Sequence, residues 1–196
     1  MGKFLWNGGP MRQHRSSLTK RSRRCGFTLV ELIVTIAIAS ILLGVAAPSF
    51  RQAMITNRVA SLTNEFVASL QFARSEAVMR KTRVTLCKSA TVGSATPTCD
   101  NSASWEDGWI VFLDGGVQGS IDGGDSVLKV GRPDSGNAVV SGGTNFSTYV
   151  SYLSTGVGSG SSASDGEFTV CIPPEQRNIS ISRTGRISVG KSGCSS

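Results

Sequence analysis

The strongest constraint on this chain is an apolar segment that carries a single charge. Within residues 27–47, Glu31 is the only ionisable side chain. As an α-helix this segment would span about 32 Å, which matches a hydrocarbon core of about 30 Å. A carboxylate inside such a helix costs on the order of 2.5–3.5 kcal/mol at the bilayer centre and is retained mainly where it has a partner. The segment therefore predicts a membrane helix whose one acid has a function.

The positive charge of the chain lies in front of this segment. The formal net charge is +7, and seven of the 20 basic residues fall within residues 1–26, which contain no Asp or Glu. The remaining 13 basic residues balance all 13 acidic ones. The positive-inside rule then predicts a cytoplasmic N-terminus and a C-terminal part beyond the membrane, the periplasm in a bacterium. The high isoelectric point therefore says little about the partners of the C-terminal part.

Three other membrane signals fit these residues less well. A secretory signal has an apolar run of about 7–15 residues, which is shorter than residues 27–47, and cleavage after Ala47 would leave a proline in first place. A lipoprotein signal places its cysteine after the apolar run, whereas Cys25 precedes it. A plain uncleaved anchor stays open, but it gives no reason for Glu31.

The stretch "GFTLVE", residues 26–31, follows basic residues and precedes the apolar run, and it resembles the class III signal of type IV pilins and type II secretion pseudopilins. The resemblance implies that prepilin peptidase cuts between Gly26 and Phe27 and that Phe27 is N-methylated. It also implies that Glu31 pairs with the N-terminal amine of a neighbouring subunit, and that Pro48 is the family's proline at the end of the span. A chance glutamate near the bilayer edge is the alternative.

Physical chemistry agrees with this role of the acid. Cleavage would create an ammonium group at Phe27, and the ammonium of one helix can neutralise Glu31 of another within an apolar layer. An anion in the first turns of a helix is also favoured by the helix dipole. Translation could begin at Met1 or at Met11, and either start gives the same mature chain.

The sequence divides into four regions. We expect a basic leader over residues 1–26, a transmembrane helix over 27–47, an amphipathic helix over 48–82 and a β-rich periplasmic head over 83–196. Apolar residues of the amphipathic helix recur every three or four positions and are Ile55, Val59, Leu62, Phe66, Leu70, Ala73 and Ala77. This stripe is predicted to pack under the following sheet rather than to form a coiled coil. The opposite face is predicted to carry Arg51, Asn57, Arg58, Asn64, Ser75 and Glu76.

The head is predicted to consist of short strands. The β-branched and aromatic runs are residues 83–88, 108–114, 126–131, 137–142, 145–154, 167–172, 177–182 and 186–190. Glycine-rich residues 114–125 and 154–166 are predicted to be mobile loops. A long helix packed on an antiparallel β-sheet head is an α+β fold of pilin-like architecture.

Two further stretches narrow the family. Residues 66–87 and 105–116, together with a late strand hairpin, resemble the GspH/FimT branch of minor pseudopilins and minor pilins. Trp105 and Trp109 are predicted to pack in the core or at an edge rather than to bind a ligand. The resemblance implies a minor pilin built into a type IV pilus, with other minor pilins, the assembly machinery and the inner membrane as partners. The H-type pseudopilin of a type II secretion system is the alternative.

Four of the five cysteines lie in the head, and Cys25 is set apart from them. They contain no CxxC pair, which argues against zinc and thioredoxin-like sites. Four cysteines allow three pairings, and Cys87 with Cys99 and Cys171 with Cys194 are favoured because both close local loops. Reduced, buried cysteines are the alternative.

The sequence offers little for catalysis or for a metal. The only histidine, His14, lies in the leader, so the mature chain lacks imidazole for a triad or a histidine zinc site. Asp114, Asp122 and Asp125 lie in a glycine-rich loop and leave calcium open, although the spacing matches no EF-hand and Asp-Gly pairs are common in turns. We therefore predict no enzyme, no cofactor and no metal.

The C-terminal hairpin carries a basic cluster. Its charged residues are Glu175, Arg177, Arg183, Arg186 and Lys191. Such a cluster can bind DNA phosphates in a salt-dependent way. FimT-like proteins of natural transformation carry a Gly-Arg-x-Arg motif near this point; Gly185 and Arg186 match it, but Ser188 replaces the second arginine. DNA binding through Arg183, Arg186 and Lys191 is thus a hypothesis, and an ordinary solvated hairpin is the alternative.

Overall fold

The computed structural model describes residues 26–133 and 136–195. They form two compact units that divide between Gly44 and Val45. The leader, with Met1, Met11, His14 and Cys25, lies outside the described residues. In chain order the elements are α1 (Leu29–Arg80), β1 (Val84–Lys88), the 3₁₀ helix η1 (Trp105–Asp107), β2 (Trp109–Leu113), β3 (Ser126–Gly131), β4 (Val139–Ser141), β5 (Tyr149–Tyr152), β6 (Gly158–Gly160), β7 (Gly166–Ile172), β8 (Glu175–Ile181) and β9 (Ile187–Gly193).

The predicted stripe of α1 is the buried face of the helix in the second unit. Val59, Phe66 and Leu70 are each at most 1% exposed, and Ile55 packs against the same core from its margin. The prediction that Glu76 lies on the exposed face is wrong, because this residue is only 8% exposed. It follows Ala73 by three positions and so lies on the same side of the helix. Its carboxylate pairs with Arg80, which is one turn further along.

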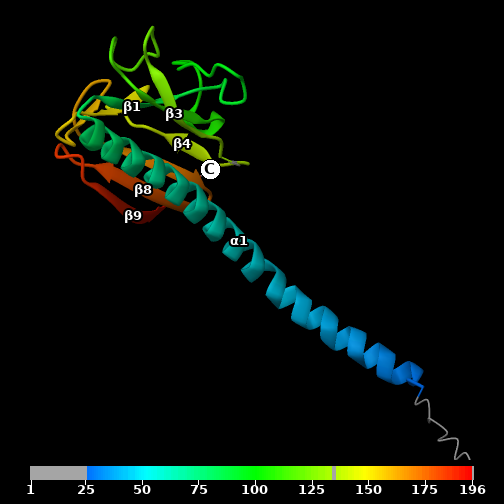
Figure 1. Cartoon of the computed structure of the whole chain (residues 1–196). Helices are drawn as coiled ribbons and strands as arrows, with labels where there is room; N and C mark the ends of the chain where they lie inside the picture. Colours follow the sequence, from blue (N-terminus) through cyan, green and yellow to red (C-terminus); the bar gives the residue numbers. More distant parts are fainter. Residues whose placement is uncertain (1–25, 134–135, 196) are drawn as a thin grey trace, which may run out of the picture. The chain divides into compact units, whose positions relative to one another are not determined.

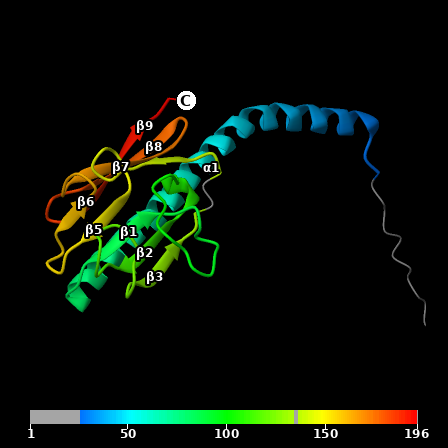
Figure 2. The same cartoon turned by 90° about the horizontal axis from the view of Figure 1, so that it is seen from above.

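The nine strands within residues 26–133 and 136–195 form two antiparallel sheets rather than one. The first sheet has the order β3-β2-β1-β5-β6, and the second has the order β4-β7-β8-β9. In the second unit, β8 and β9 lie on one side of the helix and β1 and β3 on the other (Figure 1). Figure 2 shows the same division from above. The α+β prediction is confirmed, with a helix packed on antiparallel strands.

One core holds the helix and both sheets together. It includes Phe66 and Leu70 from α1, Trp109 from the first sheet, and Phe168 and Ile179 from the second. The ring of Phe66 meets those of Trp105, Trp109 and Phe168 edge-on, with centroids 5.6, 5.0 and 4.7 Å apart. The two tryptophans are 3% and 0% exposed, so the prediction that they pack is confirmed.

Two elements were not predicted from the sequence. Strand β6 lies inside the glycine-rich stretch that we expected to be a loop, and it pairs with β5 through Ser159 opposite Ser151. Gly160 is needed there because a Cβ atom would lie 2.3 Å from the carbonyl oxygen of Asn145. The 3₁₀ helix η1 is capped by Ser104, whose backbone N–H donates to Asp107.

Candidate functional site

The predicted cleavage site lies just before α1. Gly26 and Phe27 are exposed and non-helical, and the side chain of Phe27 is 77% exposed. Thr28 caps the helix: its hydroxyl accepts a hydrogen bond from the backbone N–H of Glu31 at 3.2 Å, and its carbonyl accepts one from Leu32 at 3.1 Å. An N-cap residue of this kind fixes where a helix begins. The Gly26–Phe27 peptide bond therefore lies outside the helix, and both residues are exposed.

Glu31 lies in the first turn of α1 and is exposed. Its carboxylate has no hydrogen-bond or ion-pair partner among the residues that the structure describes. The capping contact uses only its backbone N–H, so both carboxylate oxygens are available to another group. A carboxylate at a helix N-terminus is stabilised by the dipole, and an ammonium group is the partner that would neutralise it in an apolar layer.

The residues around Glu31 are apolar and exposed. The large apolar side chains that are exposed in the first unit are Phe27, Leu29, Val30, Leu32, Ile33, Val34, Ile36, Ile38, Ile41, Leu42 and Leu43. The helix contains a window with a mean hydropathy of 2.5, which makes it long and apolar enough to cross a membrane. A continuous exposed apolar surface of this kind marks a membrane or protein interaction site. Pro48 lies within α1, and its side chain is outside what the structure describes.

Both predicted disulfides are present. Cys87 pairs with Cys99 over a separation of 12 residues, and Cys171 pairs with Cys194 over 23 residues. The first bond holds the loop after β1 against the outer face of the first sheet, where Cys87 is buried with Ile110. The second bond ties β7 to the end of β9 across the intervening strand β8. The alternative of reduced cysteines is therefore excluded in this structure.

The aspartates of the glycine-rich loop stabilise the loop itself. Asp114 is 1% exposed and accepts hydrogen bonds from Arg83 at 2.6 Å and from the backbone of Gly119 at 2.9 Å. Asp122 accepts from the backbone of Val117, and Asp125 accepts from two further backbone N–H groups. Within residues 26–133 and 136–195, no three His, Cys, Asp or Glu side chains gather as metal ligands would. The carboxylates considered for calcium are thus engaged with loop backbone.

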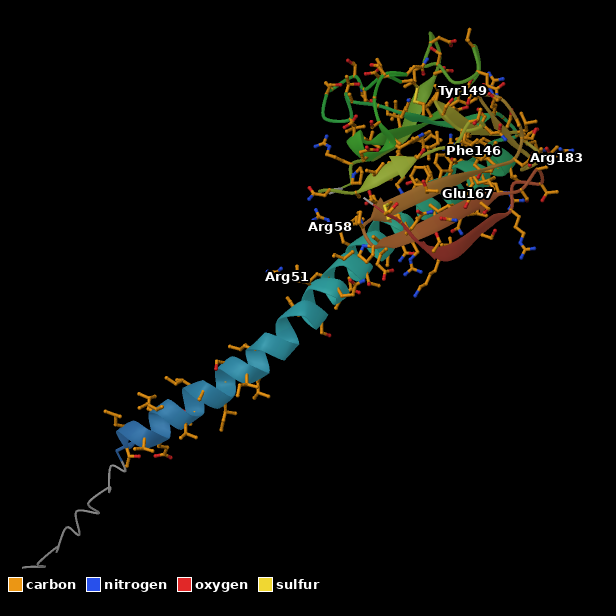
Figure 3. All side chains as sticks on the ribbon, turned by 180° about the vertical axis from the view of Figure 1, so that it is seen from behind. Arg51, Arg58, Phe146, Tyr149, Glu167 and Arg183 are labelled. Carbon is orange, nitrogen blue, oxygen red and sulfur yellow. A yellow bond between two sulfur atoms is a disulfide. The ribbon has the colours of Figure 1, made fainter. Side chains whose placement is uncertain are left out.

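The basic residues of the β8–β9 hairpin lie on different surfaces. Arg183 projects from the hairpin turn (Figure 3), and its guanidinium lies 3.8 Å from the carboxylate of Asp165. Arg183 and Glu167 line the same surface hollow. Arg186 instead lines a groove beside α1 together with Arg74. The structure therefore does not bring Arg183 and Arg186 together.

Gly185, which matches the first position of the Gly-Arg motif, has a structural reason to be glycine. Its φ is +75°, and a Cβ atom there would lie 2.1 Å from the carbonyl oxygen of Gly156. Its N–H donates to the carbonyl of Ser182, which closes the hairpin turn. The glycine of this motif is therefore required by the turn, and its presence says nothing about DNA.

Two further residues, Thr28 and Tyr152, stand out in the structure but not among the predicted site residues. Thr28 sets the start of α1, and its spacing from Glu31 is that of a capping box, which could have indicated it. Tyr152 is fully buried, and its hydroxyl has no hydrogen-bond partner among the described residues. Burial raises the pKa of Tyr152 well above its usual range, and no sequence pattern signals this.

Two solved structures are similar to this chain in the arrangement of helix and strands. Two crystal structures of the type IV minor pilin FimU from Pseudomonas aeruginosa strain PAO1, in different space groups, are both 18% identical to this chain. The first has a TM-score of 0.46, and the matched region covers 67% of this chain and 91% of the FimU chain. The second has a TM-score of 0.48, and the matched region covers 71% of this chain and 90% of the FimU chain. No curated protein sequence matches the chain.

Two family models match the sequence itself. The model of the prokaryotic N-terminal methylation motif matches residues 21–47, which include Gly26, Phe27 and Glu31. The model described as type II transport protein GspH matches residues 62–185, which is more than half of the chain. The matched residues run from the buried face of α1 to the turn of the β8–β9 hairpin. The chain therefore belongs to the GspH family of pilin-like proteins, which are structural subunits rather than enzymes.

Proposed function

We propose that this protein is a minor pilin that is processed, extracted from the inner membrane and built into a type IV pilus, where it acts in priming assembly. The observation that carries the proposal is the methylation motif in front of an exposed apolar helix, joined to a GspH-type head. The free carboxylate of Glu31 supports it, since this acid has no partner among the described residues. The head would make lateral contacts with other subunits.

In this proposal prepilin peptidase cuts the chain between Gly26 and Phe27 and methylates the new N-terminus. Phe27 is separated from Glu31 by three residues, and the cap formed by Thr28 keeps Phe27 outside the helix. A terminus held in this way is free to meet the Glu31 of a neighbouring subunit. The proposal places the leader in the cytoplasm, a single span in the inner membrane and the head in the periplasm, in agreement with the positive-inside rule.

A secretion pseudopilus is the alternative within the same class of assembly. An H-type pseudopilin would use the same cleavage site, the same apolar helix and the same acid, so a deletion strain provides the test. Deletion is expected to reduce twitching motility and surface pili while secretion of exoproteins continues. Loss of exoprotein secretion with normal twitching would instead assign the protein to a type II secretion system.

DNA binding through the hairpin stays a prediction with its own test. Arg183 lies near Asp165 and Glu167, and this acidic surrounding weakens attraction for phosphates. If DNA is bound, changing Arg183 and Arg186 together to Ala should abolish retention of DNA by the full chain in a gel shift at low salt. An unchanged gel shift would remove the hairpin as the DNA site. Transformation efficiency in the deletion strain gives the corresponding measurement in cells.

A further inference from the structure

The last strand, β9, is an open edge of the second sheet. It stands at the end of the order β4-β7-β8-β9 and is 7 residues long, whereas β4 at the opposite edge has 3 residues. Proteins ordinarily shorten, cover or bulge an exposed edge, because its unpaired backbone groups can pair with another chain. The strand pairs with β8 without a register shift along its whole length. Its outer side therefore forms a regular row of free backbone groups.

The residues that present these groups follow from the hydrogen bonds at the two ends of the hairpin. Arg186 accepts a hydrogen bond from Ser182, and Cys194 donates one to Pro174. In an antiparallel ladder, hydrogen-bonded pairs alternate with non-bonded pairs. The even-numbered residues of β9 therefore bond to β8, and the odd-numbered ones direct their N–H and C=O groups outward. Apart from Gly193, the residues whose backbone N–H and C=O groups point away from β8 are Ile187, Val189 and Lys191.

An apolar groove lies beside this edge. The outward-facing residues of β9 pair in register with Ile181, Ile179 and Arg177 of β8. Both isoleucines are buried on the side of the sheet that faces the helix. Residues directly opposite each other in a sheet direct their side chains to the same face, so the side chain of Val189 is also on the helix side, and it is 49% exposed. The groove has a volume of about 580 Å³ and lies between α1 and the start of β9. It is lined by Gln71, Arg74, Ser75, Val78, Met79, Arg186 and Ile187.

The helix side of β8 and β9 also carries basic side chains that form no ion pair among the described residues. Arg177 and Lys191 are directly opposite each other on β8 and β9, an arrangement that destabilises a sheet when both charges have the same sign. Neither forms an ion pair among the residues that the structure describes, nor does Arg186, which precedes β9 and lines the groove. The Nε atom of Arg177 is buried and has no hydrogen-bond acceptor in the described part of the chain. The neighbouring acid, Glu175, instead accepts a hydrogen bond from Gln52 of α1.

We propose that β9 accepts one more strand, supplied by an extended segment of a neighbouring filament subunit that bears at least one carboxylate. The added strand would bond to the outward groups of β9, place apolar side chains in the groove near Val78 and Met79, and bring its acid to Lys191 and Arg177. The source of the strand rests on the proposed function, since it requires assembly into a filament. Strand addition of this kind draws its affinity from backbone bonds and its specificity from alternate side chains.

Nucleic acid fits this edge less well than a peptide. A phosphate backbone cannot use a row of alternating N–H and C=O groups spaced for a strand. The hairpin from Glu175 to Cys194 contains no aromatic residue on which bases could stack. The exposed apolar side chains of Val78 and Met79, which are 48% and 70% exposed, also favour a peptide with apolar side chains.

The test uses site-specific photo-crosslinking of the full chain in cells that assemble filaments. Val189→p-benzoylphenylalanine places the reactive group on the helix side of β9, and the crosslinked peptide in sheared filaments is identified by mass spectrometry. The matched control is Val127→p-benzoylphenylalanine on β3, an edge of the other sheet with a similar exposed fraction of 41%. The expected product joins Val189 to an Asp- or Glu-containing extended segment of another pilin-type subunit, and the Val127 control should not give it.

Charge reversal tests the acid directly. Adding Lys191→Glu should lower the yield of the Val189 crosslink by about tenfold or more, as expected for loss of a charge-assisted hydrogen bond. Lys129→Glu on β3 reverses a charge away from this edge and should leave the yield unchanged. Mobility on non-reducing gels checks that the Cys171–Cys194 disulfide has formed in each variant.

A proline scan separates strand addition from simple contact. Val189→Pro removes an outward N–H, which β8 does not use, and should lower recovery of the chain in filaments about tenfold relative to Val189→Ala. Gly190→Pro removes an N–H that bonds to β8 and is expected to destabilise the head itself. Equal recovery of Val189→Pro and Val189→Ala would contradict pairing at this edge.

The possible outcomes distinguish the two proposals. Absence of the unmodified chain from filaments, although it is expressed and processed, would overturn the proposed function and this inference together. Normal incorporation without a Val189 crosslink would overturn the strand addition alone. A nuclease-sensitive product, or a crosslink to a helical surface without acids, would also overturn it.

Discussion

Replacing Phe66 by Ala should weaken the packing of α1 against both sheets. The ring is 1% exposed and contacts Trp105, Trp109 and Phe168 edge-on. Truncating a buried phenylalanine costs about 3–5 kcal/mol, and an aromatic pair contributes about 0.5–1.5 kcal/mol beyond its buried area. We expect the free energy of unfolding to fall by about 4–5 kcal/mol, near the upper end of the first range.

Urea unfolding of the full chain in detergent, followed by tryptophan fluorescence, measures this loss. Trp105 and Trp109 both lie against the ring of Phe66 and report directly on the contact. A change of this size should also lower the melting temperature by about 10 °C or more, at about 2–4 °C per kcal/mol for a chain of this length. Phe66→Leu keeps most of the apolar volume and should cost less than half as much.

Val78→Ala is the matched control, because Val78 lies on the same helix and is 48% exposed. A surface change of this kind usually alters stability by no more than about 0.5 kcal/mol. If Phe66→Ala and Val78→Ala lowered the free energy of unfolding equally, the aromatic contacts of Phe66 would not be what holds α1 to the sheets.

Three further outcomes are expected. Glu31→Ala should leave removal of the leader intact but prevent incorporation into sheared filaments, as immunoblots of both fractions would measure; normal incorporation would contradict the pairing role. Tyr152→Phe removes a buried hydroxyl without a partner and should raise the free energy of unfolding by about 1 kcal/mol in urea titrations, whereas a loss would reveal a hidden partner. Replacing Cys171 and Cys194 together by Ser should cost about 3 kcal/mol for a closed loop of 23 residues, and no loss of stability would show that β9 does not need the bond.

Local patterns in the sequence were sufficient to predict the helix and most strands. The spacing of Val59, Phe66 and Leu70 follows the helical period, and all three are in the core. Glu76 shows the limit of this reasoning, because a polar residue at the margin of the stripe can be buried when its own helix supplies Arg80 as a partner. The period identifies a face, but the chemistry of a residue does not decide its exposure.

Strand pairing could not be predicted from the sequence. Val84 of β1 pairs with Tyr152 of β5 across a long stretch of chain, and β4, which lies between them in sequence, joins the other sheet. These pairings depend on contacts between distant residues, which alternation of side chains does not encode. Strand β6 was missed for a different reason, since Gly158 and Gly160 have no side chains to reveal a period.

The candidate site divides in the same way. Gly26, Phe27 and Glu31 lie within six residues of sequence, so a resemblance to the class III signal was sufficient to predict a processing and assembly role for them. The charges of the hairpin are also close in sequence, but its turn at Gly185 places Arg183 beside Asp165 and Arg186 beside α1. The direction of each side chain depends on the fold, and a count of charges could not supply it.

The exposed apolar half of α1 also bears on whether assembly can be reversed. Lipid tails are about as apolar as leucine and isoleucine side chains, so moving residues 29–44 from a bilayer into a bundle of similar helices changes the hydrophobic free energy little. In the proposed role, the direction of transfer must then come from polar pairing at Glu31 and from work done by the assembly machinery. A subunit held in this way could return to the membrane intact and be used again, because neither environment exposes its helix to water.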